Sequence, residues 1–343
     1  MIYKNNPALE TILPGFPGVP YLPPPPGRKH GGRFTGDLDS HYNHPISIGR
    51  ALHWQINMLA RRRAARRDAR CPLNLQNVDT PLPLDRDCLI WLGHAGFLLY
   101  LGGRRILIDP CFAPLPMVQE YAPPPPIAYK LGHIDYLLIS HGHLDHLNAP
   151  SLRELRLDRA STALLPLEMG RIMRKIRPGL TVQEAGWFQR YNLPEADKND
   201  LEIVFLPARH WHRRTLRDQN TMLWGSYFIR FAGKSIYFGG DTGPGDHFRL
   251  IRKACGPMDW CLLPIGAYDP SWLMQRSHMG PEEALAAFTE LGGQRFLPMH
   301  WGTYRLSSEP MGEPISRLRA AAEKQGLAPE ALVTPHPGEI VPI

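Results

Sequence analysis

HGHLDH, at residues 141–146, is the stretch of this sequence that decides its fold and chemistry. It places three histidines and one aspartate within six residues, directly after the apolar run 135–140. Neutral imidazole and carboxylate are good ligands for Zn²⁺ and other divalent transition metals. Because helical residues two apart point away from each other, this spacing predicts a loop at the end of a strand. Such a loop can direct its first two histidines toward one ion, and its aspartate and last histidine toward a second.

Two four-coordinate ions need more ligands than this segment supplies. Further candidates come shortly after other predicted strands, at their carboxyl ends: His210, Asp241 and His300. An aspartate can bridge two ions, and each histidine can complete the coordination of one. His212 is an alternative to His210 on these grounds. The pattern predicts that all these side chains collect at one edge of a sheet.

Short apolar runs between turn signals predict strands over much of the chain. Gly102-Gly103 and Ala232-Gly233-Lys234 mark two hairpin turns. The predicted strands are 88–92, 97–101, 104–109, 135–140, 201–206, 225–231, 235–240, 258–265 and 295–299. A helix is predicted over 281–291, because Pro281 suits its first turn and a glycine pair follows its end. Strands with helices between and outside them predict an α/β fold, a four-layer αβ/βα sandwich.

The first 46 residues differ in composition from the rest, because they are rich in proline and glycine. Pro23 to Pro26 stand in a row, and such a run favours polyproline II and resists packing into a core by itself. Residues 1–46 are therefore expected to be an arm that either wraps the protein or is mobile. Residues 47–343 are expected to form a single domain.

Residues 49–70 have the pattern of a basic helix. Leu52, Ile56 and Leu59 share one face, and six arginines crowd positions 61–70. Two interpretations remain open at this point. The segment is either a solvated helix with a charged end or a basic amphipathic element that rests on anionic phospholipid.

Composition narrows the class of protein further. The chain has 343 residues, is 43% hydrophobic and 21% charged, and so is neither disordered nor fibrous. A net charge of +7 is modest for this length and favours anionic partners. Five scattered cysteines without a C-x-x-C pair argue against a disulfide framework. No run of ~18 apolar residues and no signal-peptide pattern occur. We therefore expect a cytoplasmic location, either free or peripheral to a membrane.

Several further blocks of sequence follow one another in a fixed order: KHGGRFT (29–35), WLGHAGF (91–97), LIDPCF (107–112), LLISHGHLDHL (137–147), RHWHRRTLRDQN (209–220), LWGS (223–226), GGDTG (239–243), PIGAY (264–268), HMGPEEA (278–284) and MHWGT (299–303). In this order the blocks resemble the metallo-β-lactamase superfamily. Within it, they resemble most the phospholipases D that hydrolyse N-acylphosphatidylethanolamines. The likeness extends from about Lys29 to about Tyr304.

The resemblance implies two Zn²⁺ ions per subunit, with Mn²⁺ or Fe²⁺ as alternatives, and it selects His210 over His212. It assigns the first ion to His141, His143 and His210, the second to Asp145, His146 and His300, and the bridge to Asp241. A hydroxide shared by the two ions would be the nucleophile at neutral pH, with Asp145 orienting it.

The resemblance also implies the substrate: an N-acylphosphatidylethanolamine-type phospholipid, cleaved to phosphatidic acid and N-acylethanolamine. Arg213 and Arg214 match basic family positions near the substrate phosphate, where they would form charge-assisted hydrogen bonds. Gln119 and Tyr121 lie in the proline-rich stretch that replaces the family's phosphate-contact loop, and are candidate substrate contacts. His278 matches a family histidine beside the metals, as a substrate contact or proton donor. His94 also has a family counterpart, with a supporting or structural role.

Other functions are weighed against this one. The main alternative is a soluble hydrolase of a sugar-phosphate lactone or other small ester. A non-catalytic binding protein on the same fold is disfavoured, because all seven metal-ligand positions are filled by suitable residues. The arginine cluster alone supports nucleic-acid processing, so no nucleic-acid partner is expected. A peripheral membrane contact and a homodimer are kept as options for assembly.

Overall fold

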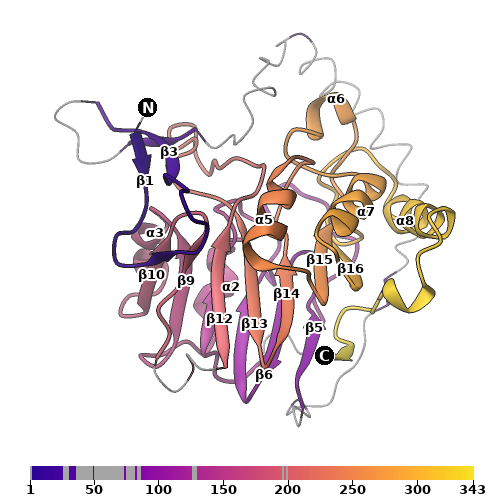
Figure 1. Ribbon diagram of the computed structural model, residues 1–343, viewed down its shortest axis with the longest axis horizontal. Helices are drawn as coiled ribbons and strands as arrows, with labels where there is room; N and C mark the ends of the chain where they lie inside the picture. Colours follow the sequence, from indigo (N-terminus) through magenta and orange to yellow (C-terminus); the bar gives the residue numbers. More distant parts are fainter. Residues whose placement is uncertain are drawn as a thin grey trace.

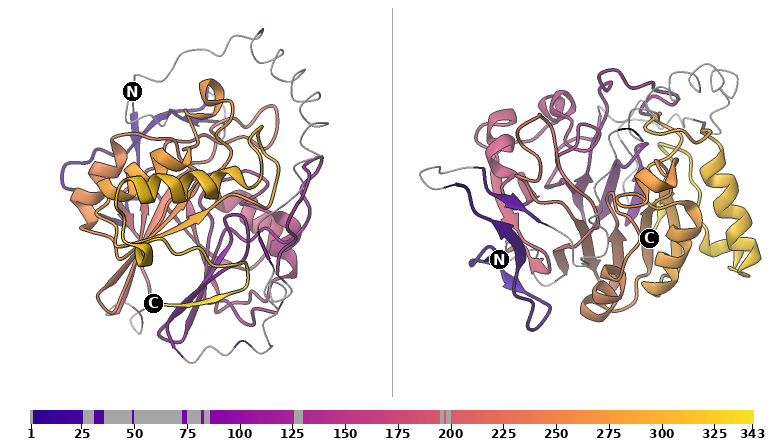
Figure 2. Two further views of the ribbon diagram at one scale, coloured as in Figure 1. Left: turned by 90° about the vertical axis from the view of Figure 1, so that its right-hand side faces the viewer. Right: turned by 90° about the horizontal axis from the view of Figure 1, so that it is seen from above.

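The computed structural model describes residues 2–25, 31–35, 49, 73–74, 82, 86–125, 130–194, 197 and 200–343. Two seven-stranded sheets face each other at its centre, and helices cover their outer faces (Figures 1 and 2). This arrangement confirms the predicted α/β class and its four layers. Apart from Gly49, the predicted helix at 49–70 lies outside the described residues.

The first sheet has the strand order β10-β9-β8-β7-β6-β5-β17. Strands β5 to β7 form an antiparallel meander, and β7 to β10 run parallel. The helices α2 (Ala149–Glu154) and α3 (Gly170–Ile176) supply apolar side chains to the core cluster on its outer face. The strands are β5 (Cys88–Trp91), β6 (Phe97–Leu101), β7 (Arg104–Ile108), β8 (Tyr136–Leu138), β9 (Thr162–Pro166), β10 (Thr181–Ala185) and β17 (Ile340–Pro342).

The second sheet has the strand order β16-β15-β14-β13-β12-β11-β2. Its outer side carries α5 (His247–Cys255), α7 (Pro281–Glu290) and α8 (Glu313–Lys324), and α7 packs on β15 (Figure 1). Two short helices, α6 (Ser271–Met274) and the 3₁₀ helix η3 (Pro329–Ala331), lie in its connections. The strands are β2 (Glu10–Thr11), β11 (Gln189–Arg190), β12 (Leu201–Leu206), β13 (Ser226–Phe231), β14 (Lys234–Phe238), β15 (Trp260–Pro264) and β16 (Arg295–Met299).

The main core fills the space between the two sheets. Phe97 of one sheet meets Phe238 of the other edge-to-face, with ring centroids 6.0 Å apart. Each large apolar side chain that is fully buried here contributes about 1.5–3 kcal/mol to stability. Because helices also cover the outer faces, β5 and β15 are buried at every residue. Strands that are buried on both faces consist of nearly continuous apolar residues, and for this reason they could be predicted from the sequence.

The N-terminal segment packs against the sheets over its described residues. Strands β1 (Ile2–Lys4), β3 (Val19–Leu22) and β4 (Arg33–Phe34) form a small sheet of their own. Between them, β2 pairs with β11 and extends the second large sheet. No helix among the described residues has the length and apolar character needed to cross a membrane.

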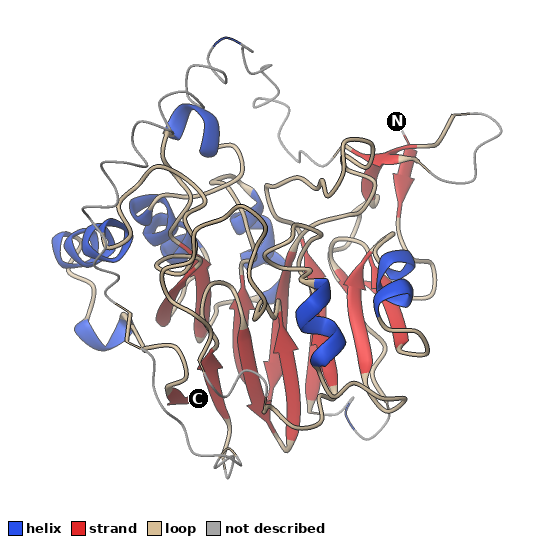
Figure 3. Ribbon diagram, turned by 180° about the vertical axis from the view of Figure 1, so that it is seen from behind, coloured by secondary structure: helices blue, strands red, loops and turns tan. Residues whose placement is uncertain are grey.

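The loops that matter for function gather where the two large sheets meet at one edge. In the first sheet β5, β7 and β8 point the same way, and in the second β12, β14, β15 and β16 do. The loops that follow these strands lie above their ends in Figure 3. The connections after these strands carry the histidines and aspartates described next.

Candidate metal centre

All seven side chains predicted to bind metal come together at this edge. The metal loop, residues 141–147, follows β8, and the remaining ligands follow β12, β14 and β16. They form two groups on either side of Asp241. The first group is His141, His143 and His210, and the second is Asp145, His146 and His300.

Three ring nitrogens converge in the first group. His143 Nδ1 lies 2.9 Å from His141 Nε2 and 3.1 Å from His210 Nε2. Nitrogens bound to one tetrahedral Zn²⁺ at its usual distance are about 3.3 Å apart, so the spacing matches a shared ion. His210 Nδ1 lies 3.0 Å from the Ser277 carbonyl oxygen and can only donate to it, which leaves Nε2 with a free lone pair.

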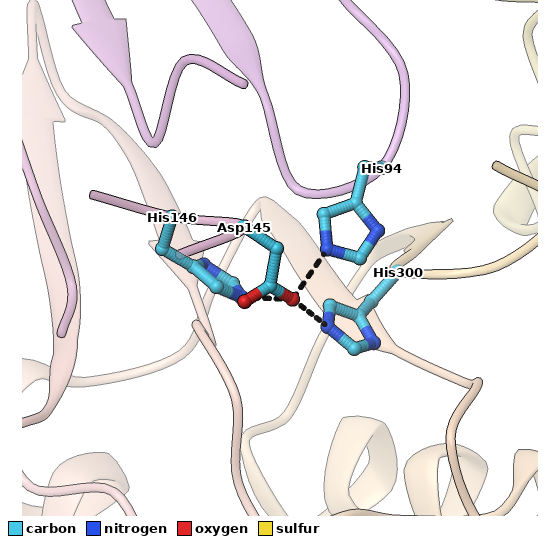
Figure 4. A group of neighbouring side chains, drawn as sticks. All are labelled: His94, Asp145, His146 and His300. Atoms are coloured by element: carbon cyan, nitrogen blue, oxygen red, sulfur yellow. Dashed lines mark hydrogen bonds and ion pairs between the residues drawn. The ribbon is translucent and has the colours of Figure 1, made fainter. Parts of the chain in front are cut away.

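The second group surrounds the carboxylate of Asp145 (Figure 4). Asp145 Oδ2 lies 3.6 Å from both His146 Nε2 and His300 Nε2. His94 Nε2 donates to the same oxygen at 2.9 Å. His94 is therefore in direct contact with a predicted ligand, a more specific role than its sequence position indicated.

Asp241 lies between the two groups, with one oxygen directed to each. Its Oδ2 is 3.9 Å from His141 Nε2 and 3.8 Å from His210 Nε2. Its Oδ1 is 3.3 Å from His146 Nε2 and 3.1 Å from His300 Nε2. Its side chain is only 2% exposed. This is the placement that a carboxylate bridging two ions would need.

The polar atoms of the site are not satisfied by protein alone. Among the described residues, His146 Nε2, His300 Nε2 and Asp241 Oδ1 are buried. Both nitrogens lie within 3.3 Å of this oxygen, but none of the three atoms makes a well-aligned hydrogen bond. A buried polar atom left unpaired costs about 1–3 kcal/mol, so such atoms seldom cluster without a ligand. Imidazole nitrogens and carboxylate oxygens are the ligand set of divalent zinc, manganese or iron. The residues present therefore fit bound metal.

Burial and charge set the protonation of these ligands. Burial lowers the pKa of His143 to about 4, so its ring is neutral, as a metal ligand must be. Burial also opposes the charged form of His300, but the charges of Asp241 and Asp145 raise its pKa to about 9. For Asp241, burial acts against ionisation, and the neighbouring charges of His300 and His146 hold its pKa well below its usual range. A bound divalent cation would take over the role of those protons.

Asp109, which follows β7, was not among the predicted site residues. Its Oδ2 accepts from His146 Nδ1 at 2.7 Å, and its Oδ1 accepts from the Ser140 backbone N–H at 2.7 Å. It is fully buried and has a positive φ of 42°, a conformation uncommon outside glycine. Its position at the end of a strand was the signal available in the sequence, as it was for Asp241 shortly after β14.

The residues predicted to contact substrate differ in their distance from the metal centre and in their exposure. His278 Nδ1 lies 3.9 Å from Asp241 Oδ2, at the metal centre. Arg213 is exposed, with its guanidinium carbon 5.5 Å from the Trp211 ring centroid. Gln119 is exposed, and the hydroxyl of half-buried Tyr121 accepts from Arg305 Nη1 at 3.0 Å.

Arg214 differs from the expectation that it faces the substrate phosphate. Its guanidinium Nη1 donates to backbone carbonyls of the metal loop, because it lies 2.7 Å from Gly142 O and 3.0 Å from Leu147 O. These two contacts engage both N–H groups of that nitrogen. The two neighbouring arginines thus have different surroundings.

Two facing sheets with a buried histidine and aspartate cluster on their shared edge define the architecture of a metal-dependent enzyme. The profile of the β-lactamase superfamily domain matches residues 104–301. An uncharacterised protein from Mycobacterium tuberculosis is 36% identical over 302 residues, which cover 85% of this chain and 77% of that protein. The N-acyl-phosphatidylethanolamine-hydrolyzing phospholipase D 1 of Caenorhabditis elegans is 32% identical over 264 residues, 73% of this chain and 74% of that enzyme.

A metallo hydrolase from Ignicoccus hospitalis, Igni18, has a similar fold, with a TM-score of 0.57 and 23% identity over 74% of this chain and 97% of its own. The matched profile and the sequence relatives show that this chain belongs to the metallo-β-lactamase superfamily of metal-dependent hydrolases. The family resemblance identified from the sequence is thereby confirmed.

Proposed function

We propose that this protein is a binuclear zinc phosphodiesterase that hydrolyses N-acylphosphatidylethanolamine-type phospholipids to phosphatidic acid and N-acylethanolamines. The observation that carries the two-ion site is Asp241, whose two oxygens face separate groups of histidines. The similarity to the nematode phospholipase D supports the substrate class. When bound, two divalent ions would lower the pKa of water toward neutrality and offset the charge of a phosphodiester.

Different residues of the chain would hold each of the two ions. His141, His143 and His210 would hold one ion, Asp145, His146 and His300 the other, and Asp241 both. The Asp145 side chain is 13% exposed, more than the 2% of Asp241, so it borders the space left for substrate. The hydrogen bond from His94 fixes the orientation of that carboxylate.

His278 is positioned to contact a substrate bound at the centre. Its Nδ1 has no hydrogen-bond partner among the described residues and faces the Asp241 carboxylate. Burial lowers the pKa of His278 to about 4, so its ring is neutral at pH 7. We propose that it donates a neutral N–H to a phosphate oxygen, the first of the two roles predicted for it.

Arg213 is the arginine that we propose to contact the phosphate. Arg213→Ala should raise KM about tenfold, because one charge-assisted hydrogen bond is lost at a partly solvated site. Zinc content should not change, since Arg213 makes no described contact with a ligand. Steady-state kinetics together with metal analysis of the purified variant would check this. Loss of zinc from this variant would contradict the assignment.

Exposed apolar side chains on loops of the metal centre support a lipid interface. Leu144 of the metal loop is 44% exposed, and Leu216 and Met117 are 93% and 97% exposed. Single exposed apolar residues are ordinary, but these three lie on loops that border one site. With the exposed positive charge of Arg213 on the same loop as Leu216, they are suited to an anionic phospholipid surface.

The Leu216→Glu and Met117→Glu double variant should bind vesicles of mixed phosphatidylcholine and phosphatidic acid several-fold more weakly, because it replaces two apolar contacts with negative charges. Vesicle sedimentation measures the bound fraction. The matched control is Leu22→Glu, at a residue 51% exposed on the N-terminal sheet, which should bind like the unmodified protein. Equal binding by all three proteins would remove the support for this surface.

The substrate itself is tested by direct assay. Zinc-saturated protein is incubated with N-acylphosphatidylethanolamine in detergent, and the lipid products are separated by mass spectrometry. Release of phosphatidic acid and N-acylethanolamine in equal amounts is the expected result. Absence of phosphatidic acid, with turnover of a sugar-phosphate lactone or another small ester, would replace this proposal with the soluble-hydrolase alternative.

A further inference from the structure

We infer that Arg214 is a positioning residue, whose guanidinium fixes the backbone of the metal loop and so sets the placement of its histidines. The inference rests on the metal site of the proposed function, but not on the identity of the substrate. It replaces the phosphate-binding role that the sequence indicated for this residue.

The contacts of Arg214 join the beginning of the metal loop to its end. Nη1 lies 2.7 Å from Gly142 O, 3.0 Å from Leu147 O and 3.5 Å from His143 O. Within the loop, the Leu147 backbone N–H donates to His143 O at 2.8 Å, which closes a tight turn. The two hydrogen bonds from one guanidinium nitrogen, to Gly142 O and Leu147 O, hold the two ends of this turn together. The spacing between His141 and His143, at the start of the metal loop, is therefore fixed.

The segment that carries Arg214 is itself held rigidly. The backbone N–H groups of Arg214 and Thr215 both donate to Asp218 Oδ1, at 3.0 and 2.7 Å. The His212 backbone N–H donates to Asn220 Oδ1 at 3.0 Å. Because the segment also contains the ligand His210, Arg214 connects the two loops that supply the first group of histidines.

His212 and Gly142 show how closely these two loops approach each other. A Cβ atom at Gly142 would lie 2.4 Å from His212 Cε1, so only glycine fits there. The His212 ring is fully buried. This close contact places the Gly142 carbonyl within reach of Arg214, and it explains the glycine of the H-G-H motif by packing.

The charge of Arg214 also suits a positioning role. Its guanidinium is partly buried, and burial lowers its pKa, although an arginine stays protonated at neutral pH. Arg213, by contrast, is exposed and makes no such backbone contacts.

The test compares variants of three neighbouring arginines: Arg214→Met, Arg213→Met and Arg217→Met. Zinc affinity is measured by competition with a chromophoric chelator, and the visible spectrum of the Co²⁺-substituted protein reports ligand geometry without any substrate. Arg214→Met should lower zinc affinity about 10–100-fold, as is usual when a group that orients a ligand is lost. Its Co²⁺ spectrum should change, and at saturating zinc kcat should fall more than KM rises. Arg213→Met should raise KM only, and Arg217→Met, at an exposed position, should change nothing.

If the methionine variant does not fold, Arg214→Lys distinguishes a role in positioning the metal loop from a role in binding phosphate. Lysine keeps the positive charge that a phosphate would need, but its Nζ is one bond closer to the backbone than the Arg214 Nη1 that contacts both carbonyls, so it should not reach Gly142 O and Leu147 O together. A positioning role predicts reduced zinc affinity with partial recovery relative to methionine. Unchanged zinc affinity and Co²⁺ spectrum, with a raised KM in both Arg214 variants, would overturn the inference. Since neither metal readout uses a lipid, failure of the lipid assay would leave this result unaffected.

Discussion

Asp241→Asn is expected to remove bound metal and hydrolytic activity together. The Asp241 carboxylate faces both sets of histidines, with Oδ1 3.1 Å from His300 Nε2 and Oδ2 3.8 Å from His210 Nε2. An amide has one acceptor oxygen and no negative charge, so it cannot bridge two cations. Metals supply several kcal/mol of transition-state stabilisation, so the activity should fall on the order of 10³-fold or more.

Metal content by mass spectrometry and initial rates on the same preparation would measure both effects of Asp241→Asn. Asp246→Asn is the matched control, because that carboxylate follows the same strand, is exposed, and pairs only with exposed Arg249 among its described contacts. The control should keep full metal and full activity. Two metal equivalents retained in Asp241→Asn, with activity near that of the control, would show that Asp241 does not bridge.

The fold was predictable for strands that are buried on both faces, because such strands appear in the sequence as nearly continuous apolar runs. The predicted strands 97–101, 201–206 and 295–299 coincide with β6, β12 and β16. The helix predicted over 281–291 ends one residue earlier, at Glu290. Long apolar runs bounded by turn residues leave few alternatives, and this is where the prediction succeeded.

Other elements left too little signal to be predicted. Strand β10 lies at the edge of its sheet and presents Thr181, Gln183 and Glu184, so its apolar alternation is weak. The helices α5 and α8 were missed for another reason: their buried residues do recur at helical spacing, as Ile315, Leu318 and Ala322 do in α8, but many charged residues lie between them. The β2 strand of the N-terminal segment exists because β11 offers it a sheet edge, a tertiary contact that local sequence does not encode.

Some features of the site could likewise be predicted from local sequence, whereas others depend on contacts between distant loops. The clustering of the seven predicted metal ligands could be anticipated, because four of them lie within six residues of sequence and the others come shortly after predicted strands. The hydrogen bonds of Arg214 to Gly142 and Leu147 were not, since residue type and position alone are equally consistent with a phosphate contact. Only the packing of two distant loops decides between those roles.

Asp109→Asn should impair the second group of ligands although it changes no ligand and almost no volume. Asp109 Oδ2 accepts from His146 Nδ1 at 2.7 Å, which places the proton on Nδ1 and leaves Nε2 free for metal. An asparagine can keep its oxygen on the Ser140 backbone N–H, and its NH₂ group then faces His146. Two donors cannot pair, so the imidazole would adopt the other tautomer, with its proton on Nε2, where metal must bind.

The expected result for Asp109→Asn is a loss of about 10–100-fold in metal affinity, the usual effect of removing a group that orients a ligand. One ion should be lost before the other, because His141, His143 and His210 have no described contact with Asp109. Chelator titration would resolve two affinities, and ¹⁵N NMR of the histidine rings would report the tautomer. Asp135→Asn is the control, since Asp135 also accepts a backbone N–H, from Arg105 at 2.8 Å, but at the far end of β8. Equal loss of both ions, or an unchanged tautomer at His146, would mean that Asp109 supports the fold of the whole centre and not one ligand.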